Sequence, residues 1–350
     1  MPRAMRPRHI LCLLIPALGL VPALTAATAA RAADSAVILM YHRFGQDKYP
    51  STNIRMGQFK KHLAVLKKPK YTVLPVPRIL ERLKSGQGVP ENTVGLTIDD
   101  AYASVFKNGW PAFKEAGLPF TLFVSTDPVD EGHGDYMSWE QLKTLADSEL
   151  VTIGNHTADH AHMPDESREA NAEAVSRATR RLKEKLGETP EYFAYPYGEA
   201  DRKAMAVVRD KGFKAAFGQH SAALWSGSNM YYLPRFALNE NYGAIDRFRT
   251  VVDTVSIHPA QVTPGMPTVD ENPPSFGFTV KRDGLDLANL TCFASHEGRV
   301  NRQVLGGGRV EVRLTRPFPP GRGRINCTKP AGDGRFYWFG YQFHVPGDAG

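Results

Sequence analysis

Two adjacent carboxylates, Asp99 and Asp100, end the apolar stretch 94–98. This stretch is typical of a buried strand, and an unpaired charge held away from water costs several kcal/mol. A pair of acids at such a strand end therefore contributes little to packing. It indicates a metal site, a proton-transfer role, or both.

Two histidines with metal-ligand spacing follow another short strand, which we expect at 151–154. His156 and His160 are four residues apart, so a single helical turn would bring both imidazoles to one face. Alone, this spacing is also typical of a solvated helix turn. Together with one aspartate, however, the histidines make a set of three ligands. Such a set leaves coordination positions open for water or substrate, as in catalytic zinc sites.

The two aspartates have different tasks if the site is catalytic. One binds the metal, and the other accepts a proton from a metal-activated water, whose pKa falls toward about 7 on coordination. Histidine is the natural general acid at neutral pH. The residues themselves leave open which aspartate takes which task.

Short apolar strands alternate with helical patterns through the first two thirds of the chain. The expected strands are 36–41, 71–74, 94–98, 120–124, 151–154, 192–195 and 214–217, and the expected helices are 56–68, 77–84, 103–116, 138–147, 166–186 and 202–211. This alternation predicts an α/β fold with a parallel sheet, and seven strands over about 200 residues favour a barrel. The carboxyl ends of parallel strands meet at one mouth, so His42, the two aspartates and the histidine pair are expected to converge there.

Residues 1–33 have the pattern of a secretory signal peptide. Three arginines, Arg3, Arg6 and Arg8, precede an apolar run over 10–24, and small residues follow. The alternative is a membrane anchor, but the run contains two prolines and is shorter than the roughly 20 residues of a membrane span. We therefore expect a periplasmic or secreted protein with no membrane span after cleavage.

The basic charge of the chain depends partly on this leader. Residues 1–33 contain four arginines and no acids, so the formal charge falls from +7 to +3 without them. No run of basic residues remains. The sequence predicts no nucleic-acid partner.

The composition changes after residue 258. Five prolines between 259 and 274 predict a stiff linker between a domain at 34–258 and a module at 275–350. Strand patterns at 276–280, 290–294, 309–314 and 335–343 make that module small and all-β. Cys292 and Cys327 are predicted to form a disulfide in an oxidising compartment. The aromatic residues of 336–343 fit the core side of a strand, although aromatic rings also stack on sugars.

Three ordered segments resemble the motifs of one enzyme family. Residues 97–100 (TIDD), 156–160 (HTADH) and 193–198 (FAYPYG) are similar to the first three motifs of polysaccharide deacetylases of the NodB-homology type, carbohydrate esterase family 4. The resemblance covers about residues 36–255. It implies a distorted (β/α)7 barrel that removes acetyl groups from N-acetylated sugar polymers with Zn²⁺ or another divalent transition metal such as Co²⁺, Ni²⁺ or Mn²⁺.

The resemblance also implies roles for single residues. Asp99 would be the catalytic base, and Asp100 would bind the metal with His156 and His160.

Further roles follow for the third motif and for one arginine. The backbone N–H of Tyr197 would stabilise the oxyanion, in a turn shaped by Pro196 and Gly198. Arg235 matches a position where relatives orient the base, although a surface salt bridge explains it equally well.

The general acid has two candidates. Residues 39–42 (LMYH) resemble the opening strand of the subgroup that acts on poly-β-1,6-N-acetylglucosamine, in which the N-terminal histidine supplies the acid. This favours His42. The usual late leucine-x-histidine motif has only a partial match at 256–258, which makes His258 the alternative.

The sequence thus predicts a hydrolase that removes N-acetyl groups from an N-acetylglucosamine polysaccharide. It would use a metal-activated water, Asp99 as base and His42 as acid. The alternatives are a peptidoglycan or chitin-oligomer deacetylase, an O-acetyl esterase on the same scaffold, and a non-catalytic protein of glycan binding or export. The intact set of four candidate site residues, Asp99, Asp100, His156 and His160, counts against the last.

Overall fold

The computed structural model describes residues 1, 2, 4 and 32–347. Most of the expected signal peptide, residues 1–33, lies outside the described residues. Within the described part, no helix has both the length and the apolar character needed to cross a membrane.

The first domain contains a curled sheet of nine strands, and seven parallel strands follow one another around it. Six of them pair in the order β1 (Ser35–Tyr41), β5 (Thr93–Ile98), β6 (Phe120–Val124), β7 (Val151–Asn155), β8 (Tyr192–Ala194) and β9 (Ala215–Phe217). The seventh, β11 (Phe236–Ala237), pairs with β1. Leu233 bridges to Phe217 of β9, so the segment 233–237 brings the sheet back to its first strand. The predicted distorted barrel is confirmed.

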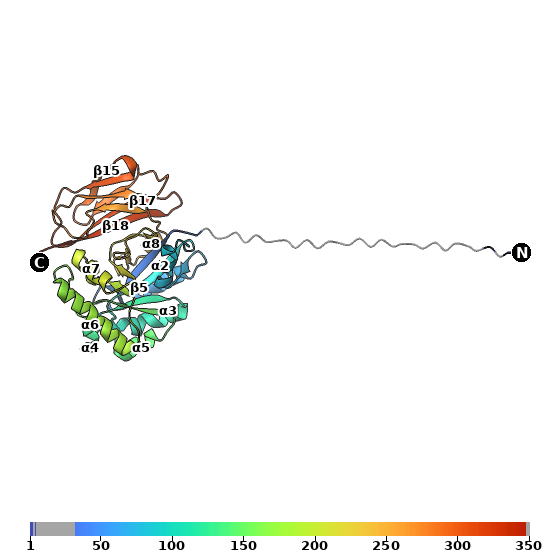
Figure 1. Cartoon of the computed structure of the whole chain (residues 1–350), viewed down its shortest axis with the longest axis horizontal. Helices are drawn as coiled ribbons and strands as arrows, with labels where there is room; N and C mark the ends of the chain where they lie inside the picture. The colour runs from blue at the N-terminus through green and yellow to red at the C-terminus, as the bar shows by residue number, and fades with distance from the viewer. Residues whose placement is uncertain (3, 5–31, 348–350) are drawn as a thin grey trace. The chain divides into compact units, whose positions relative to one another are not determined.

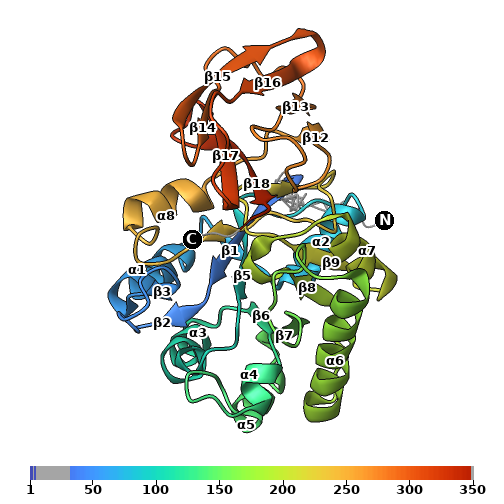
Figure 2. The same cartoon turned by 90° about the vertical axis from the view of Figure 1, so that its left-hand side faces the viewer.

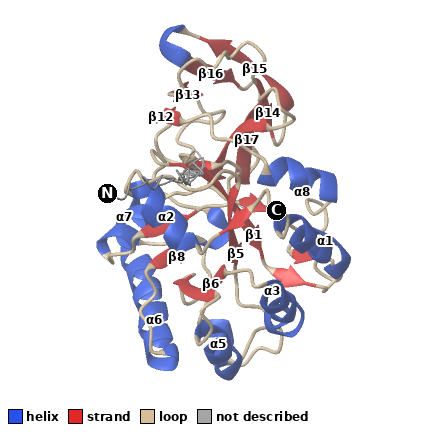
Figure 3. Cartoon of the chain, turned by 90° about the vertical axis from the view of Figure 1, so that its right-hand side faces the viewer, coloured by secondary structure: helices blue, strands red, loops and turns tan. Residues whose placement is uncertain are grey.

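Helices cover the outside of this sheet (Figures 1 and 3). They are α1 (Met56–Leu66), α2 (Val76–Lys84), α3 (Trp110–Ala116), α4 (Asp127–Asp130), α5 (Trp139–Ala146), α6 (Arg168–Leu186), α7 (Arg202–Asp210) and α8 (Ile245–Val252). The six expected helices are present, although a π-helical turn, Val105–Gly109, opens the third. The short α4 and the helix α8 were not expected from the sequence. Small strands extend the structure at β2 (Arg43–Phe44), β3 (Asn53–Ile54), β4 (Thr72–Val73) and β10 (Leu224–Trp225).

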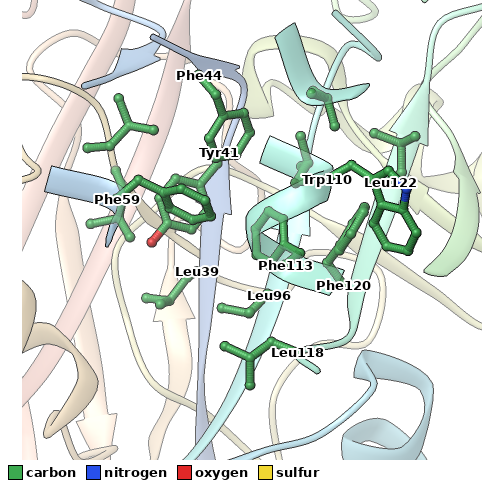
Figure 4. Packing of buried hydrophobic residues seen from close by; sticks show 14 of the residues in the cluster. Leu39, Tyr41, Phe44, Phe59, Leu96, Trp110, Phe113, Leu118, Phe120 and Leu122 are labelled. Carbon is green, nitrogen blue, oxygen red and sulfur yellow. The ribbon is translucent and has the colours of Figure 1, made fainter. Parts of the chain in front are cut away.

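An aromatic cluster fixes the carboxyl end of β1, where His42 follows. The ring of Tyr41 lies 5.7 Å from that of Phe44 and 5.6 Å from that of Phe59, between ring centroids. Phe113 packs edge-on against Phe59 at 4.9 Å (Figure 4). These side chains are almost fully buried. Close packing of this kind leaves the strand end little freedom to move.

The C-terminal module is an antiparallel, nearly closed β-barrel. Its strands pair in the order β12 (Pro259–Thr263), β13 (Phe276–Val280), β16 (Arg309–Arg313), β15 (Gly298–Val304), β14 (Thr291–Ala294), β17 (Gly321–Pro330) and β18 (Phe336–Val345). A bridge from Thr268 to His344 brings the segment after β12 against β18. Cys292 and Cys327 face each other across β14 and β17 and form the expected disulfide. The predicted all-β module is confirmed.

The expected linker, residues 259–274, is in part a piece of the module. Residues 259–263 form β12 and pair with β13. Pro259 is the first residue of a strand at the end of the sheet order, where the missing backbone N–H leaves no gap in the ladder. The density of prolines therefore marks an edge strand and its turn instead of a free connection.

The strand β18 joins the module to the barrel. Alternate side chains point into the core of the module, namely Phe339, Tyr341 and Phe343. The residues between them face the barrel, where Trp338 packs edge-on against Phe236 at 5.2 Å. A Cβ atom at Gly340 would lie 2.4 Å from the carbonyl oxygen of Ser221, so only glycine fits this approach. Figure 2 shows β17 and β18 reaching from the module to the barrel.

Candidate metal centre

The carboxyl ends of β5 and β7 bring three ligand-type side chains together. Oδ1 of Asp100 lies 3.2 Å from Nε2 of His156 and 3.1 Å from Nε2 of His160. The ligand atoms of all three residues lie within 4.8 Å of one another. The histidine pair and the second aspartate therefore form the group that the sequence predicted.

Two atoms of this group have the environment of metal ligands. Oδ1 of Asp100 and Nε2 of His156 are buried and have no hydrogen-bond partner. Leaving buried polar atoms unpaired is costly, and a divalent cation between them would satisfy both. Nδ1 of His156 donates to the carbonyl oxygen of Ala194 at 2.7 Å, which leaves the Nε2 lone pair for the metal. Two imidazole nitrogens and one carboxylate suit a transition metal such as zinc.

The predicted helical turn between the histidines is wrong, because residues 156–160 form a loop. The backbone N–H of Thr157 donates to Oδ1 of Asn155 at 2.8 Å, and that of His160 donates to Oγ1 of Thr157 at 3.0 Å. Side chains of this kind offer the backbone an alternative to helical hydrogen bonds. The spacing of four residues still brings both rings to one metal position.

Positive backbone φ angles gather around the centre. Asp100, Thr157, His160 and Tyr197 have φ values of 74°, 63°, 55° and 59°. This region is unfavourable for residues with a Cβ, at a cost of about 1–3 kcal/mol each. Strained residues of this kind concentrate at functional sites.

Asp99 makes a buried, bidentate ion pair with Arg235. Nη1 and Nη2 of the guanidinium lie 2.6 and 2.8 Å from the two carboxylate oxygens, and both side chains have an exposed fraction of 0%. Nε of Arg235 donates to the carbonyl oxygen of Gly218, and Nη1 also donates to Oγ1 of Thr97. The surface salt bridge considered for Arg235 is thereby excluded. The arginine holds Asp99 in one orientation.

The ion pair sets the protonation state of the aspartate. Burial raises the pKa of Asp99 and is the largest single effect, but the charges of Arg235, His156 and His42, together with the hydrogen bond from Arg235, outweigh it. The pKa of Asp99 therefore lies below its ordinary value, and the carboxylate is ionised at neutral pH.

His42, and not His258, lies beside this carboxylate. Nε2 of His42 is 4.0 Å from Oδ2 of Asp99, and burial lowers the pKa of the His42 ring. His258 instead pairs with Asp34 at 3.1 Å and stacks on Trp225. Asp34 precedes β1 and His42 follows it, so the two histidines belong to opposite ends of a seven-residue strand, about 20 Å apart.

The turn Pro196–Gly198 places Tyr197 next to the histidines. Its ring packs edge-on against His160 at 4.6 Å and stacks on His162 at 4.0 Å. Its carbonyl oxygen accepts a hydrogen bond of 3.1 Å from Nε2 of Gln342, a buried residue of β18. A residue of the C-terminal module thus holds the turn at Tyr197, whose preceding peptide carries the N–H that the resemblance assigned to the oxyanion.

The centre opens into a cleft of about 700 Å³. Its lining includes four of the residues discussed above: His42, Asp100, His160 and Tyr197. It also includes three residues of β17 that the sequence did not single out, Arg322, Arg324 and Asn326, and Trp338 of β18, one of the aromatic residues for which sugar stacking was the alternative to core packing. The expected site is therefore shared between the barrel and the module.

Known proteins resemble the barrel. Residues 86–216 match the family model described as polysaccharide deacetylase. The poly-β-1,6-N-acetyl-D-glucosamine N-deacetylase of Staphylococcus aureus strain MRSA252 is 23% identical over an alignment of 233 residues, and the match covers 59% of this chain and 80% of that protein.

Solved structures share the fold. The IcaB structure from Ammonifex degensii aligns with a TM-score of 0.54 and 27% identity, covering 62% of this chain and 97% of that one. The Streptococcus pyogenes deacetylase PplD aligns with a TM-score of 0.57 and 17% identity, covering 62% and 98%. More than a third of this chain has no counterpart in either structure.

Removing the carboxylate ligand tests the metal centre. We expect Asp100→Ala to lower zinc affinity by more than about 100-fold, because changes that only touch a ligand's partners already cost 10- to 100-fold. The measurement is metal content and zinc titration of purified, chelator-treated protein. Asp159→Ala is the matched control, since Asp159 lies in the loop between His156 and His160 but is exposed and near Arg177. Equal zinc affinity in both variants would remove Asp100 from the ligand set.

The buried ion pair predicts a coupled effect on stability. Arg235→Gln leaves an uncompensated carboxylate, so we expect the free energy of unfolding to fall by about 3–5 kcal/mol. The double variant Asp99→Asn with Arg235→Gln should lose much less than the sum of the single losses. Denaturant unfolding is measured for the wild-type protein, for Asp99→Asn and Arg235→Gln, and for the double variant. Arg168→Gln, which breaks the exposed pair with Asp210, is the control and should cost less than about 1 kcal/mol. Additive losses would contradict the proposed pairing.

Proposed function

We propose that this chain, which carries a polysaccharide deacetylase domain of the NodB-homology type (carbohydrate esterase family 4), is a metal-dependent hydrolase that removes N-acetyl groups from a polysaccharide containing N-acetylglucosamine. The observation that carries the proposal is the Asp100, His156 and His160 group at the base of a cleft, beside the buried pair of Asp99 and Arg235. The similarity to a poly-β-1,6-N-acetyl-D-glucosamine N-deacetylase supports the choice of sugar.

The metal ligands and the base divide the work between the two aspartates. A divalent cation held by Asp100, His156 and His160 would polarise the acetyl carbonyl and lower the pKa of a coordinated water. Asp99 accepts the proton as the new carbon–oxygen bond forms. Arg235 keeps the Asp99 carboxylate ionised and correctly turned, although it also weakens it as a base. Strict orientation compensates for modest basicity, because a fixed base needs little reorganisation.

The remaining roles fall to His42 and Tyr197. The carbon–nitrogen bond breaks only if the leaving amine takes up a proton, and His42 lines the cleft from which the amine leaves. Burial lowers the pKa of His42, so its protonated ring gives up a proton readily, while the charges of Asp100 and Asp99 partly oppose this shift. The backbone N–H of Tyr197, in the turn begun by Pro196, stabilises the negative charge on the acetyl oxygen. The products are acetate and the free amino sugar.

Acetate release tests the activity. We expect the zinc-loaded protein to release acetate from β-1,6-linked N-acetylglucosamine oligomers, with β-1,4-linked chitin oligomers, peptidoglycan fragments and O-acetylated glycans as competing substrates. Asp99→Asn and His42→Ala should each lower kcat by about 100-fold or more, because each removes a proton-transfer group. His258→Ala is the matched histidine control and should keep kcat within about threefold.

The pattern of losses separates the candidates. A lower kcat for His258→Ala with an unchanged kcat for His42→Ala would make His258 the general acid instead of His42. Release from O-acetyl esters alone would establish the esterase, and release from none of the substrates by fully zinc-loaded protein would remove the hydrolase.

The site of action is a second proposal. We propose that residues 1–33 direct export and that the mature chain works in the periplasm or outside the cell. The Cys292–Cys327 disulfide supports an oxidising compartment. In an expressing bacterium, the exported fraction should contain a chain shortened by about 33 residues with no free thiol, whereas a chain built without residues 1–33 should stay in the cytoplasm. Full-length protein in the membrane fraction would instead support an anchor.

A further inference from the structure

We propose that the C-terminal module forms a substrate-selecting wall of the cleft, and that its arginines bind an anionic group, a carboxylate or a phosphate, on a sugar next to the acetylated one. This rests on the proposed function, because it names the class of polysaccharide that reaches the same metal centre. The proposal concerns Arg322 and Arg324 of β17, with Asn326 and Trp338 beside them.

The strand register places these side chains on one face. Arg322, Arg324 and Asn326 are alternate residues of β17, so they point to the same side of the sheet, and all three line the cleft. Trp338 of β18 is directly opposite Thr328 in the register and also lines the cleft. Its indole Nε1 donates to Oδ1 of Asn326 at 2.9 Å, which fixes the ring. The wall is therefore built from rigid strands of the module.

The charge of the cleft is one-sided. Among the described residues that line it, three are arginines, Arg247, Arg322 and Arg324, and the single acid is Asp100, which belongs to the metal ligands. Neither Arg247 nor Arg324 has a carboxylate within 4.0 Å in the described part of the chain, and Arg322 has only Glu199, at 3.7 Å. Burial and the charge of Arg322 lower the pKa of Arg324. An anion bound between the arginines would relieve this repulsion.

One nitrogen of the Arg324 guanidinium is fixed by the protein, and the other two are available to a ligand. Its Nε donates to Oε1 of Gln342 at 3.1 Å, whereas its two Nη groups donate to no described residue. Paired guanidinium N–H groups fit the two oxygens of a carboxylate or phosphate. Gln342 in turn donates to the carbonyl oxygen of Tyr197. Two hydrogen bonds thus connect Arg324 to the turn beside the metal, which places the anion near the reacting sugar and not at a distant surface.

A neutral glycan accounts for less of this arrangement. Trp338 alone would serve to stack on an uncharged sugar ring, and hydroxyl groups need no fixed positive charge. Three arginines that share a single carboxylate partner among the described residues, Glu199, in one cleft raise the free energy of the unliganded protein. An anionic substrate gives that charge a function.

The experiment compares substrates that differ in one group. Acetate release is measured for a β-1,6-linked N-acetylglucosamine tetrasaccharide, for the same backbone carrying a lactyl carboxylate on alternate sugars, and for a phosphorylated form. We expect kcat/KM to be about 10- to 100-fold higher for at least one anionic form, with a preference that shrinks at high salt. The carboxylate and phosphate arms identify which anion is bound.

Three variants separate recognition from support of the turn. Arg322→Gln and Arg324→Gln should raise KM for the anionic substrate about tenfold or more and affect the neutral one much less. Arg299→Gln, an exposed arginine of β15 that does not line the cleft, is the matched control and should change neither. If Arg324 only supports Gln342 and Tyr197, Arg324→Gln will lower kcat equally for both substrates, and the proposal is overturned.

A binding measurement keeps the result independent of turnover. Metal-free protein should bind the anionic oligosaccharide more tightly than the neutral one by calorimetry, and Arg324→Gln in the metal-free protein should abolish the difference. Acetate release with no preference for an anion would overturn this inference and leave the deacetylase intact. No acetate release from any form, together with no preference in binding, would reject both.

Discussion

The buried ion pair between Asp99 and Arg235 is the interaction on which the rest of the site depends. Each charge has lost its water, and each is tolerable only because the other is within hydrogen-bond distance. Arg235 belongs to the segment 233–237 that brings the curled sheet back from β9 to β1. Closure of the barrel and orientation of the base are therefore the same structural event. A sheet that failed to close would leave an isolated carboxylate in an apolar interior.

Around this pair, the mouth of the barrel holds backbone that is unfavourable on its own. Asp100, Thr157, His160 and Tyr197 all have left-handed conformations. Side chains within the site hold the loop after β7, and Gln342 of the module holds the Tyr197 peptide. The left-handed backbone at Asp100 and His160 turns these two ligand side chains toward a single metal position, whereas regular strand or helix geometry would direct them apart. The unfavourable backbone conformations cost local stability in exchange for the geometry of the metal position, and the stability of the close-packed barrel below compensates for that cost.

The sequence predicted the chemical groups of this site better than their surroundings. Carboxyl ends of parallel strands meet by geometry, so reading His42, Asp100 and the histidine pair at those ends required no knowledge of packing. The local path was harder, and the helical turn expected at 156–160 is a loop because Asn155 and Thr157 satisfy its backbone. The role of Arg235 stayed open for a related reason. A single arginine carries no sign of burial, and the partner that excludes a surface position is more than 130 residues away in the chain.

Two features of the C-terminal module were not predictable from the sequence, namely the face of β17 and the contact with the barrel. β17 alternates arginine with glycine in its first half, which obscures the strand pattern, so the face carrying Arg324 was not recognised. Its contact with the barrel is also set by a close approach, since Gly340 leaves no room for a Cβ beside Ser221. That approach makes the module a fixed wall and not a tethered binding domain. In the proposed function the barrel mouth carries the groups that break the amide bond, and in the further proposal the module carries the charges that meet the rest of the polymer. The proposed selection and the proposed catalysis would be joined through Gln342, because one buried amide contacts both Arg324 and the Tyr197 turn.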